Sequence, residues 1–145
     1  MTIRLVYRNP GGVNSGVFIR VPEKPADVWM PVYRGYEVQI DDESDADEYH
    51  CTGVLKSLTR ALAKPSHPAE WNTMDITLAG DRTTVTVNGQ LVTDYHEGQA
   101  VPPKKEPWEP DRGPRPVSGY IGLQNYGDDA VVYFREISVR PLARL

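Results

Sequence analysis

Polar side chains recur at every second position of the segment Gly35-Tyr-Glu-Val-Gln-Ile-Asp-Asp42. Such alternation is typical of a strand with one buried face, so Glu37, Gln39 and Asp41 would share the other face. Carboxylates and amides have low β-propensity, and an ordinary wet face more often uses Thr, Lys or Ser. A carboxylate on a ligand-binding face can act as a general acid or base. We therefore expect a ligand-binding face here, with a solvated sheet face as the alternative.

The segment Asn14-Ser-Gly-Val-Phe-Ile-Arg20 alternates in the same way. Val17 and Ile19 would face the core, and Arg20 would lie on the polar face. Arg20 could there be a charge partner of Glu37 or bind ligand oxygens, because its guanidinium is planar and permanently charged. A structural ion pair between neighbouring strands is the alternative interpretation of these two residues.

The elements that would position these residues are strands. Besides the two segments above, the pattern predicts strands at 2–8, 72–78, 83–87, 90–95, 119–124 and 131–140. The turn Asn9-Pro-Gly-Gly12 predicts a hairpin between strand 2–8 and the Asn14 segment, and Asn88-Gly89 closes a meander. The alternation of apolar residues in the last strand shifts by one position near Arg135-Glu136, which predicts a β-bulge there. About eight strands and hardly any helix predict an all-β fold, an antiparallel two-sheet jelly-roll sandwich.

Composition limits the class of protein. With 145 residues and 39% hydrophobic content, the chain fits a single domain with its own core. A net charge of −4 and scattered Lys and Arg disfavour nucleic acid as a partner. No segment is apolar enough to span a membrane, and the start of the sequence lacks the features of a signal peptide. We therefore expect a cytoplasmic protein from the sequence as written. If the chain belongs to a longer exported protein, we expect a secreted or periplasmic one. Cys51 is the single cysteine, which excludes an internal disulfide.

The loops carry further candidate residues. The acidic run 41–48 could bind a divalent metal such as calcium, with a solvated loop as the alternative, and no other cofactor is expected. Segment 54–63 fits either a short helical turn or a strand.

Aromatic and histidine side chains in the loops are also candidates. The Pro-rich loop 97–117 contains Trp108, whose ring could stack on a ligand. His50 and His96 border loops, where each could supply a proton or lie exposed without a role.

Several segments, in their order along the chain, resemble a known family. They are Asn14-Ser-Gly-Val-Phe-Ile-Arg20, Gly35-Tyr-Glu-Val-Gln-Ile-Asp-Asp42, Glu70-Trp-Asn-Thr73, Val87-Asn-Gly89 and Gly119-Tyr-Ile-Gly-Leu-Gln-Asn-Tyr-Gly127. Together they are similar to the 3-keto-disaccharide hydrolase domain, formerly a domain of unknown function, over residues 2–142. The resemblance implies a concanavalin A-like jelly roll whose concave sheet face holds carbohydrate.

The resemblance also implies a reaction, the cleavage of glycosidic bonds in 3-keto-glycosides by a hydrolase or a lyase. A ketone at C3 acidifies the C2 hydrogen, so a base can remove it and the group at C1 can leave from the enolate. Glu37, Arg20 and His50 are then the candidate catalytic residues, as base or acid, enolate stabiliser and proton source. The candidate substrate contacts are Gln39, Asp41, Gln124, Trp108 and Tyr126. A non-catalytic, lectin-like carbohydrate-binding module is the alternative.

The spacing of the carboxylates argues against a direct retaining hydrolase. Glu37 and Asp41 are four positions apart on one strand, which separates their Cα atoms by about 13 Å. The two carboxyl groups of a retaining glycosidase lie only about 5 Å apart. The spacing is therefore too wide for a retaining pair, and both an inverting pair and the elimination route stay open.

Two departures from the family pattern carry expectations. Tyr126 stands where the family motif Gly-Leu-Gln-Asp-His-Gly has its His, which puts any catalytic role of that His in question here. Family members usually begin with additional strands, so strand 2–8 should form an uncovered edge, with Ile3, Leu5 and Tyr7 facing water. We expect the chain to cover this edge by forming a homodimer or by binding a partner that supplies a strand.

Overall fold

The computed structural model describes residues 1–144 and consists of two antiparallel β-sheets with little helix. The strands are β1 (Thr2–Arg8), β2 (Ser15–Val21), β3 (Tyr36–Ile40), β4 (Asn72–Ala79), β5 (Arg82–Val87), β6 (Gln90–His96), β7 (Tyr120–Leu123) and β8 (Tyr133–Arg140). Helix α1 (Met30–Arg34) lies between β2 and β3 in the chain. The predicted all-β, two-sheet jelly-roll sandwich is confirmed.

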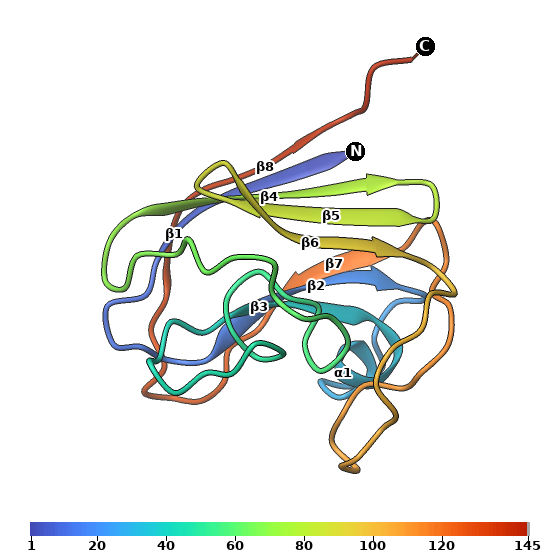
Figure 1. Cartoon of the computed structure of the whole chain (residues 1–145), viewed down its shortest axis with the longest axis horizontal. Coiled ribbons are helices and arrows are strands. Elements are labelled where there is room, and N and C mark those ends of the chain that lie inside the picture. The colour runs from blue at the N-terminus through green and yellow to red at the C-terminus, as the bar shows by residue number, and fades with distance from the viewer. Residues whose placement is uncertain (145) are drawn as a thin grey trace.

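The strands divide into a larger and a smaller sheet. Sheet A has the order β6-β5-β4-β1-β8 and sheet B the order β3-β2-β7, and sheet A lies above sheet B in Figure 1. The predicted meander is confirmed, because β4 pairs with β5 and β5 with β6. Asn88 and Gly89 both take positive φ at the tight turn between β5 and β6, which is what such a two-residue hairpin requires.

The hairpin predicted at Asn9-Pro-Gly-Gly12 is wrong, because β1 and β2 lie in different sheets. β1 pairs with β4 and β8, whereas β2 pairs with β3 and β7. The buried Asn9 side chain donates to the Val13 carbonyl at 2.6 Å and accepts from the Val13 N–H at 3.0 Å. This closed loop carries the chain across to the other sheet, and its Pro-Gly-Gly composition resembles that of a hairpin turn.

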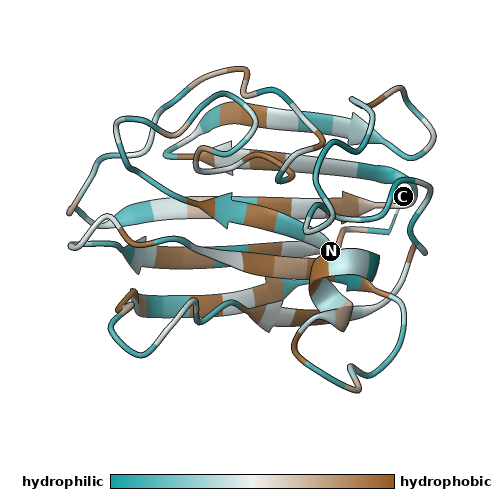
Figure 2. Cartoon of the chain, turned by 90° about the horizontal axis from the view of Figure 1, so that it is seen from below, coloured by the Kyte–Doolittle hydropathy of each residue, from teal (hydrophilic) through white to brown (hydrophobic). Residues whose placement is uncertain are grey.

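The hydrophobic core fills the space between the sheets. Hydrophobic and hydrophilic residues alternate along several strands, as Figure 2 shows. The core includes Ile3, Leu5, Tyr7, Met74, Ile76, Val85 and Val87 of sheet A and Val17, Ile19, Tyr36, Val38 and Ile40 of sheet B. Burying one aliphatic side chain completely stabilises the fold by roughly 1.5–3 kcal/mol relative to leaving it exposed. The apolar side chains of the two sheets therefore decide which face of each strand points inward.

The β-bulge predicted near Arg135-Glu136 is confirmed. In the pairing of β1 with β8, Val6 lies opposite Glu136 and Tyr7 lies opposite Phe134, so Arg135 is the extra residue. One extra residue resets the alternation of a strand, and the apolar side chains on both sides of the bulge therefore point inward.

The expectation of an uncovered edge at strand 2–8 is wrong. β1 is an interior strand between β4 and β8, and Ile3, Leu5 and Tyr7 are completely buried. The reason is non-local, since the C-terminal strand returns to pair with β1 along its whole length. An uncovered edge at β1 therefore no longer supports the expected homodimer.

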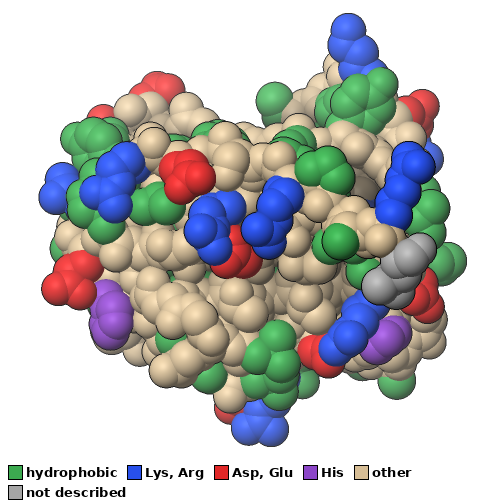
Figure 3. Space-filling view, turned by 90° about the horizontal axis from the view of Figure 1, so that it is seen from above, with side chains coloured by type: hydrophobic (Ala, Val, Ile, Leu, Met, Phe, Trp, Pro, Cys, Tyr) green, Lys and Arg blue, Asp and Glu red, His purple; other side chains and the backbone are tan. Residues whose placement is uncertain are grey.

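Two long loops connect the two sheets, and charged side chains lie on the outer face of sheet A. Segment 41–71 and the Pro-rich loop 97–117 contain neither helix nor strand. The Pro-rich loop descends below sheet B in Figure 1, whereas segment 41–71 runs past sheet B and rises again to β4. Basic and acidic side chains lie next to one another on the outer face of sheet A, as Figure 3 shows. Arg4 and Asp75 form one such pair, with 2.8 Å between Nε and Oδ1. Within residues 1–144, no helix is long and apolar enough to cross a membrane.

Candidate functional site

Three of the polar side chains predicted to share a face lie on the outer face of sheet B, which points away from sheet A. Glu37 and Gln39 alternate with the core residue Val38 along β3. Gln124 follows β7, and its N–H donates to the carbonyl of Gly16 at 2.9 Å, while Gly16 lies opposite Gln39. Residues opposite each other in antiparallel strands point to the same side, so Gln124 and Gln39 share this face.

The side-chain oxygens on this face are buried and lack hydrogen-bond partners. Within residues 1–144, this is true of Glu37 Oε1, Gln39 Oε1, Gln124 Oε1 and Asn14 Oδ1. Gln39 is only 1% exposed and Glu37 only 6%. Leaving a buried acceptor unpaired costs about 1–3 kcal/mol, and a ligand that donates hydrogen bonds would recover this free energy. Four of the seven buried side-chain atoms that lack a partner in residues 1–144 thus lie on or beside this face, which makes it the candidate binding site.

Glu37 occupies a space that Gly16 leaves open. A Cβ atom on Gly16 would lie 2.7 Å from both Cγ and Oε1 of Glu37. The other carboxylate oxygen, Oε2, lies 3.8 Å from Nζ of Lys56. Burial raises the pKa of the Glu37 carboxyl, and the Lys56 ammonium partly opposes this rise. A carboxyl with a raised pKa and an unpaired oxygen can exchange a proton closer to neutral pH than an exposed one.

Lys56 is a site residue that sequence reasoning missed. The segment that carries it runs beside β3, where the N–H groups of Gly53 and Lys56 donate to the carbonyls of Gln39 and Glu37, each at 2.9 Å. Lys56 Nζ also lies 5.8 Å from the ring centroid of Trp108, which is 47% exposed. The Pro-rich loop and the segment beside β3 thus meet next to Glu37.

His50 lies close to Trp108, with 6.4 Å between the ring centroids. Its Nδ1 is 2.8 Å from Asp47 Oδ1, and its Nε2 is 3.1 Å from Ser57 Oγ. Both ring nitrogens therefore have partners within the chain, and neither is free to contact a leaving oxygen in this arrangement. The catalytic role of His50 stays a prediction.

The predicted position of Arg20 on the polar face is wrong. Arg20 has φ of +50°, and the pairing of β2 with β7 shifts register between Phe18 and Val21. This irregularity turns the side chain inward, where it is 1% exposed. Its guanidinium donates to Thr83 Oγ1 at 3.1 Å and to the carbonyls of Gly80 at 2.8 Å, Arg82 at 3.2 Å and Pro116 at 3.0 Å.

The acidic neighbour of Arg20 is Glu97, at 3.9 Å, instead of Glu37. Arg20 therefore joins sheet B to the turn between β4 and β5, and it does not point toward the outer face of sheet B. An enolate bound on that face would have to be stabilised by another cation.

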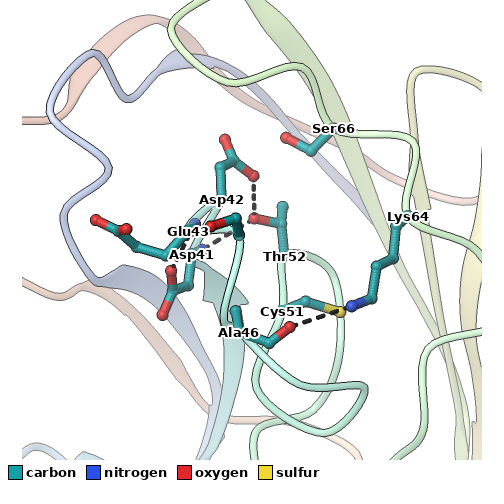
Figure 4. A pocket seen from close by; sticks show the side chains of 9 residues that line it. Asp41, Asp42, Glu43, Ala46, Cys51, Thr52, Lys64 and Ser66 are labelled. Carbon is teal, nitrogen blue, oxygen red and sulfur yellow. Dashed lines mark hydrogen bonds between the residues drawn. The ribbon is translucent and has the colours of Figure 1, made fainter.

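Asp41 and Tyr126 lie at two other hollows. Asp41 lines a cavity of about 190 Å³ beyond the end of β3, together with Asp42, Cys51 and Lys64 among others (Figure 4). Burial raises the pKa of the Asp41 carboxyl. Tyr126 lines a second hollow of about 320 Å³, which it shares with Gln124 and Asn14. Tyr126 is therefore close to the outer face of sheet B, whereas the cavity of Asp41 includes neither Glu37 nor Gln39.

The acidic run 41–48 does not form a recognisable cation site. In the part of the chain that the structure describes, no three His, Cys, Asp or Glu side chains are placed to hold a metal ion together. The Oδ1 atoms of Asp41 and Asp47 instead accept hydrogen bonds from N–H groups two residues further along, at 3.0 and 2.8 Å. Calcium binding by this loop stays a prediction.

We expect Gly16→Ala to impair the site by moving Glu37. The added Cβ would also lie 3.0 Å from the backbone oxygen of Val38, so Glu37 is the group that must shift. Any turnover should fall about tenfold or more, because a displacement near 1 Å is costly in an active site. Gly122→Ala on the neighbouring strand is the matched control, since its Cβ would meet only a Phe18 ring carbon at 4.0 Å. Equal effects of the two substitutions on turnover would contradict this reasoning.

Comparisons with known proteins place the chain among carbohydrate-related proteins. Two crystal structures from Parabacteroides distasonis ATCC 8503, both provisionally described as glycosyl hydrolases, are similar to the chain. One is 25% identical with a TM-score of 0.72 and covers 97% of this chain and 77% of that one. The other is 20% identical with a TM-score of 0.70 and covers 94% of this chain and 69% of that one.

The fold is also shared with the carbohydrate-binding module CBM66 of Bacillus subtilis, at 15% identity and a TM-score of 0.56, covering 94% of this chain and 71% of the module. A comparison with curated proteins finds no match. The family model of the 3-keto-alpha-glucoside-1,2-lyase-like domain matches residues 1–140. The family model and the 25% identical structure support a carbohydrate-related function. The chain therefore belongs to the 3-keto-alpha-glucoside-1,2-lyase-like domain family.

Proposed function

We propose that the chain binds a 3-keto-glycoside on the outer face of sheet B and cleaves its glycosidic bond by elimination. The observation that carries the proposal is the set of buried, unpaired oxygens of Glu37, Gln39, Gln124 and Asn14 on and beside this face. A sugar presents several hydroxyl donors at short spacing, so it can satisfy several of these acceptors at once. The lyase-like family description supports the reaction class.

Glu37 is the proposed base. The ketone at C3 acidifies the C2–H bond, so the carboxylate takes the C2 proton and the bonding electrons form the C2=C3 double bond of an enolate. The enolate then restores the C3 ketone, forms a C1=C2 double bond and expels the oxygen attached to C1. The leaving oxygen gains a proton from protonated Glu37 or from water. The products are a free alcohol and an unsaturated 3-keto sugar, to which water can add.

Lys56 takes the electrostatic role that was first assigned to Arg20. Its ammonium lies 3.8 Å from Glu37 Oε2, so a sugar whose C2–H faces Glu37 also has its neighbouring C3 oxygen near Lys56, which would donate to this oxygen as it becomes negative. The half-exposed ring of Trp108 lies beside Lys56 and offers a stacking surface for a sugar ring. Gln39 and Gln124 are the proposed hydroxyl contacts, with Tyr126 next to Gln124.

A non-catalytic carbohydrate-binding module is the second candidate function. It is favoured by the positions of two expected catalytic groups, since Arg20 is buried in the core and both ring nitrogens of His50 are paired. Gln39, Gln124 and Trp108 could hold a sugar without either of them.

A comparison of turnover with binding separates the two functions. The chain is mixed with a chromogenic 3-keto-glucoside and, separately, with the parent glucoside, each with added calcium and with a chelator. Release of the chromophore from the 3-keto compound alone supports the elimination. Calorimetric binding of either sugar without release supports the binding module. Neither release nor binding would refute both proposals.

We expect Lys56→Met to shift the acid limb of the pH–rate profile toward higher pH. The Lys56 ammonium lowers the pKa of Glu37 against the effect of burial, so its removal raises that pKa further. A reaction that requires ionised Glu37 should then reach its plateau only at a higher pH. The measurement is kcat/KM across the pH range, and Lys64→Met is the control, because Lys64 Nζ binds the Ala46 carbonyl at 3.1 Å instead. An unchanged acid limb in Lys56→Met would exclude this electrostatic role.

A further inference from the structure

One side of the sandwich is open. β7 is the edge of sheet B and β8 is the edge of sheet A on this side. Leu123 lies opposite the core residue Val17, and Ile137 and Val139 lie opposite the core residues Leu5 and Ile3, so these side chains point toward the space between the sheets. They are nevertheless 45%, 48% and 50% exposed, respectively. The inward-facing side chains of β7 and β8 thus lack the covering layer that the rest of the core has.

The opposite side of the sandwich shows what a covered edge looks like in this chain. There residues 53–62, which run beside β3, close the gap between the two sheets. Thr93 Oγ1 of β6 donates to the Gly53 carbonyl at 2.7 Å. Further along, the N–H of Leu62 donates to the carbonyl of Val92 at 3.0 Å. Val92 and the β3 residue Val38 are both completely buried. No chain segment within residues 1–144 does the same for Ile137 and Val139 at the β8 edge.

The exposed apolar side chains of β7 and β8, together with Val131 just before β8, make up what we call the β7–β8 strip. Its members are Ile121, Leu123, Val131, Ile137 and Val139, each between 42% and 50% exposed. The hollow of about 320 Å³ that contains Tyr126 lies at one end of the strip, where Leu123, Val132 and Phe134 also line it. Single exposed aliphatic residues are normal, but several of them along two edge strands on the same side of a sandwich are typical of a protein interface.

We propose that a second copy of this chain covers the β7–β8 strip, by antiparallel pairing of the two β8 strands about a twofold axis at Ser138. In this register Glu136 of each copy lies opposite Arg140 of the other, and Ile137 of each copy lies opposite Val139 of the other. Opposite charges and apolar pairs facing each other across strands stabilise an antiparallel ladder by roughly 0.2–1 kcal/mol each. Sheet A then continues from one copy into the next.

Self-complementarity favours a second copy over an unrelated partner. Glu136 and Arg140 are both exposed, and they lie on the same face of β8 with Ser138 between them. A twofold axis uses each favourable pair twice and places the two apolar strips against each other. The interface would lie on a different side of the molecule from the edge first expected at strand 2–8.

Sedimentation equilibrium of the whole chain at micromolar concentration tests the proposal. We expect twice the 16.3 kDa chain mass for the wild type. Glu136→Arg should weaken the dimer about tenfold or more, because it places two arginines opposite each other. The double variant Glu136→Arg with Arg140→Glu should restore the dimer, since the charges are exchanged within each pair. Ile137→Glu should also give monomers.

The control is Leu91→Glu, because Leu91 is 41% exposed on β6 at the other edge of sheet A and should leave the dimer intact. Circular dichroism of each variant shows whether it is folded. Failure of the double variant to recover the dimer would refute this register. A monomeric wild type would refute the proposal altogether, as would a dimer that none of the β8 substitutions weakens.

Discussion

Glu37→Gln is expected to lower kcat/KM on a 3-keto-glycoside by about 10²–10⁴-fold, the usual contribution of general acid–base catalysis. The amide keeps the shape of the side chain in the space above Gly16, but it cannot take the C2 proton. Sugar affinity should change little, because an amide oxygen can still accept a hydroxyl hydrogen bond. Steady-state kinetics and calorimetry on the same preparation measure both quantities.

The pH dependence of stability gives an independent check on Glu37. Burial raises the pKa of this carboxyl in the folded chain above its unfolded value. Folded Glu37 therefore binds its proton more tightly, and its contribution to stability is greatest below the unfolded pKa and declines as the pH rises through the folded pKa. Gln has no proton to lose, so the variant should lack this decline and be at least as stable as the wild type at neutral pH.

Urea unfolding at acidic and at neutral pH measures this difference. Glu23→Gln is a suitable control, because Glu23 is an exposed carboxylate that pairs with Arg34 instead of Lys56. It should change neither turnover nor the pH dependence of unfolding. A marked loss of stability in Glu37→Gln at neutral pH would instead indicate that the pair with Lys56 is structural, and unchanged turnover would remove Glu37 from the reaction.

The face that carries Glu37 could be predicted because alternation depends only on the strand itself. Whichever strands become its neighbours, a period of two places Glu37 and Gln39 opposite Val38. The β5–β6 hairpin was equally accessible, since Asn88-Gly89 specifies a tight turn locally. The bulge at Arg135 could also be located, because the apolar pattern of the last strand changes phase there.

Features that depend on contacts between distant segments could not be predicted. Arg20 follows the alternation of its strand in sequence, but a positive φ in a residue other than glycine has no local signature and reverses its direction. Lys56 reaches Glu37 because its segment pairs beside β3, which no local periodicity indicates. The burial of Ile3 and Leu5 depends on β8, which lies more than a hundred residues further along the chain.

Arg20→Met is expected to lower the free energy of unfolding by about 3–5 kcal/mol, the usual cost of removing one partner from a buried charged network. Methionine roughly fills the space of the aliphatic stem, so the loss reports mainly on the guanidinium. The carbonyls of Gly80, Arg82 and Pro116 would lose the guanidinium as a donor. Glu97 would lose the cation at 3.9 Å, although it also accepts from Tyr36 at 2.7 Å and from the Arg115 N–H at 2.9 Å. Urea unfolding measures the loss, and Arg82→Met, which removes only an exposed pair with Asp94, should change stability far less.

The same variant distinguishes a structural role of Arg20 from a catalytic one. Measured at a temperature where Arg20→Met is fully folded, turnover per molecule should stay within about threefold of the wild type, because the guanidinium contacts the turn between β4 and β5 and not the outer face of sheet B. A group that stabilised the enolate would show the opposite pattern, since removing it lowers kcat by about a hundredfold or more even when the fold is intact. Such a loss in the folded variant would return Arg20 to the catalytic group and would mean that the inward orientation changes when the sugar binds.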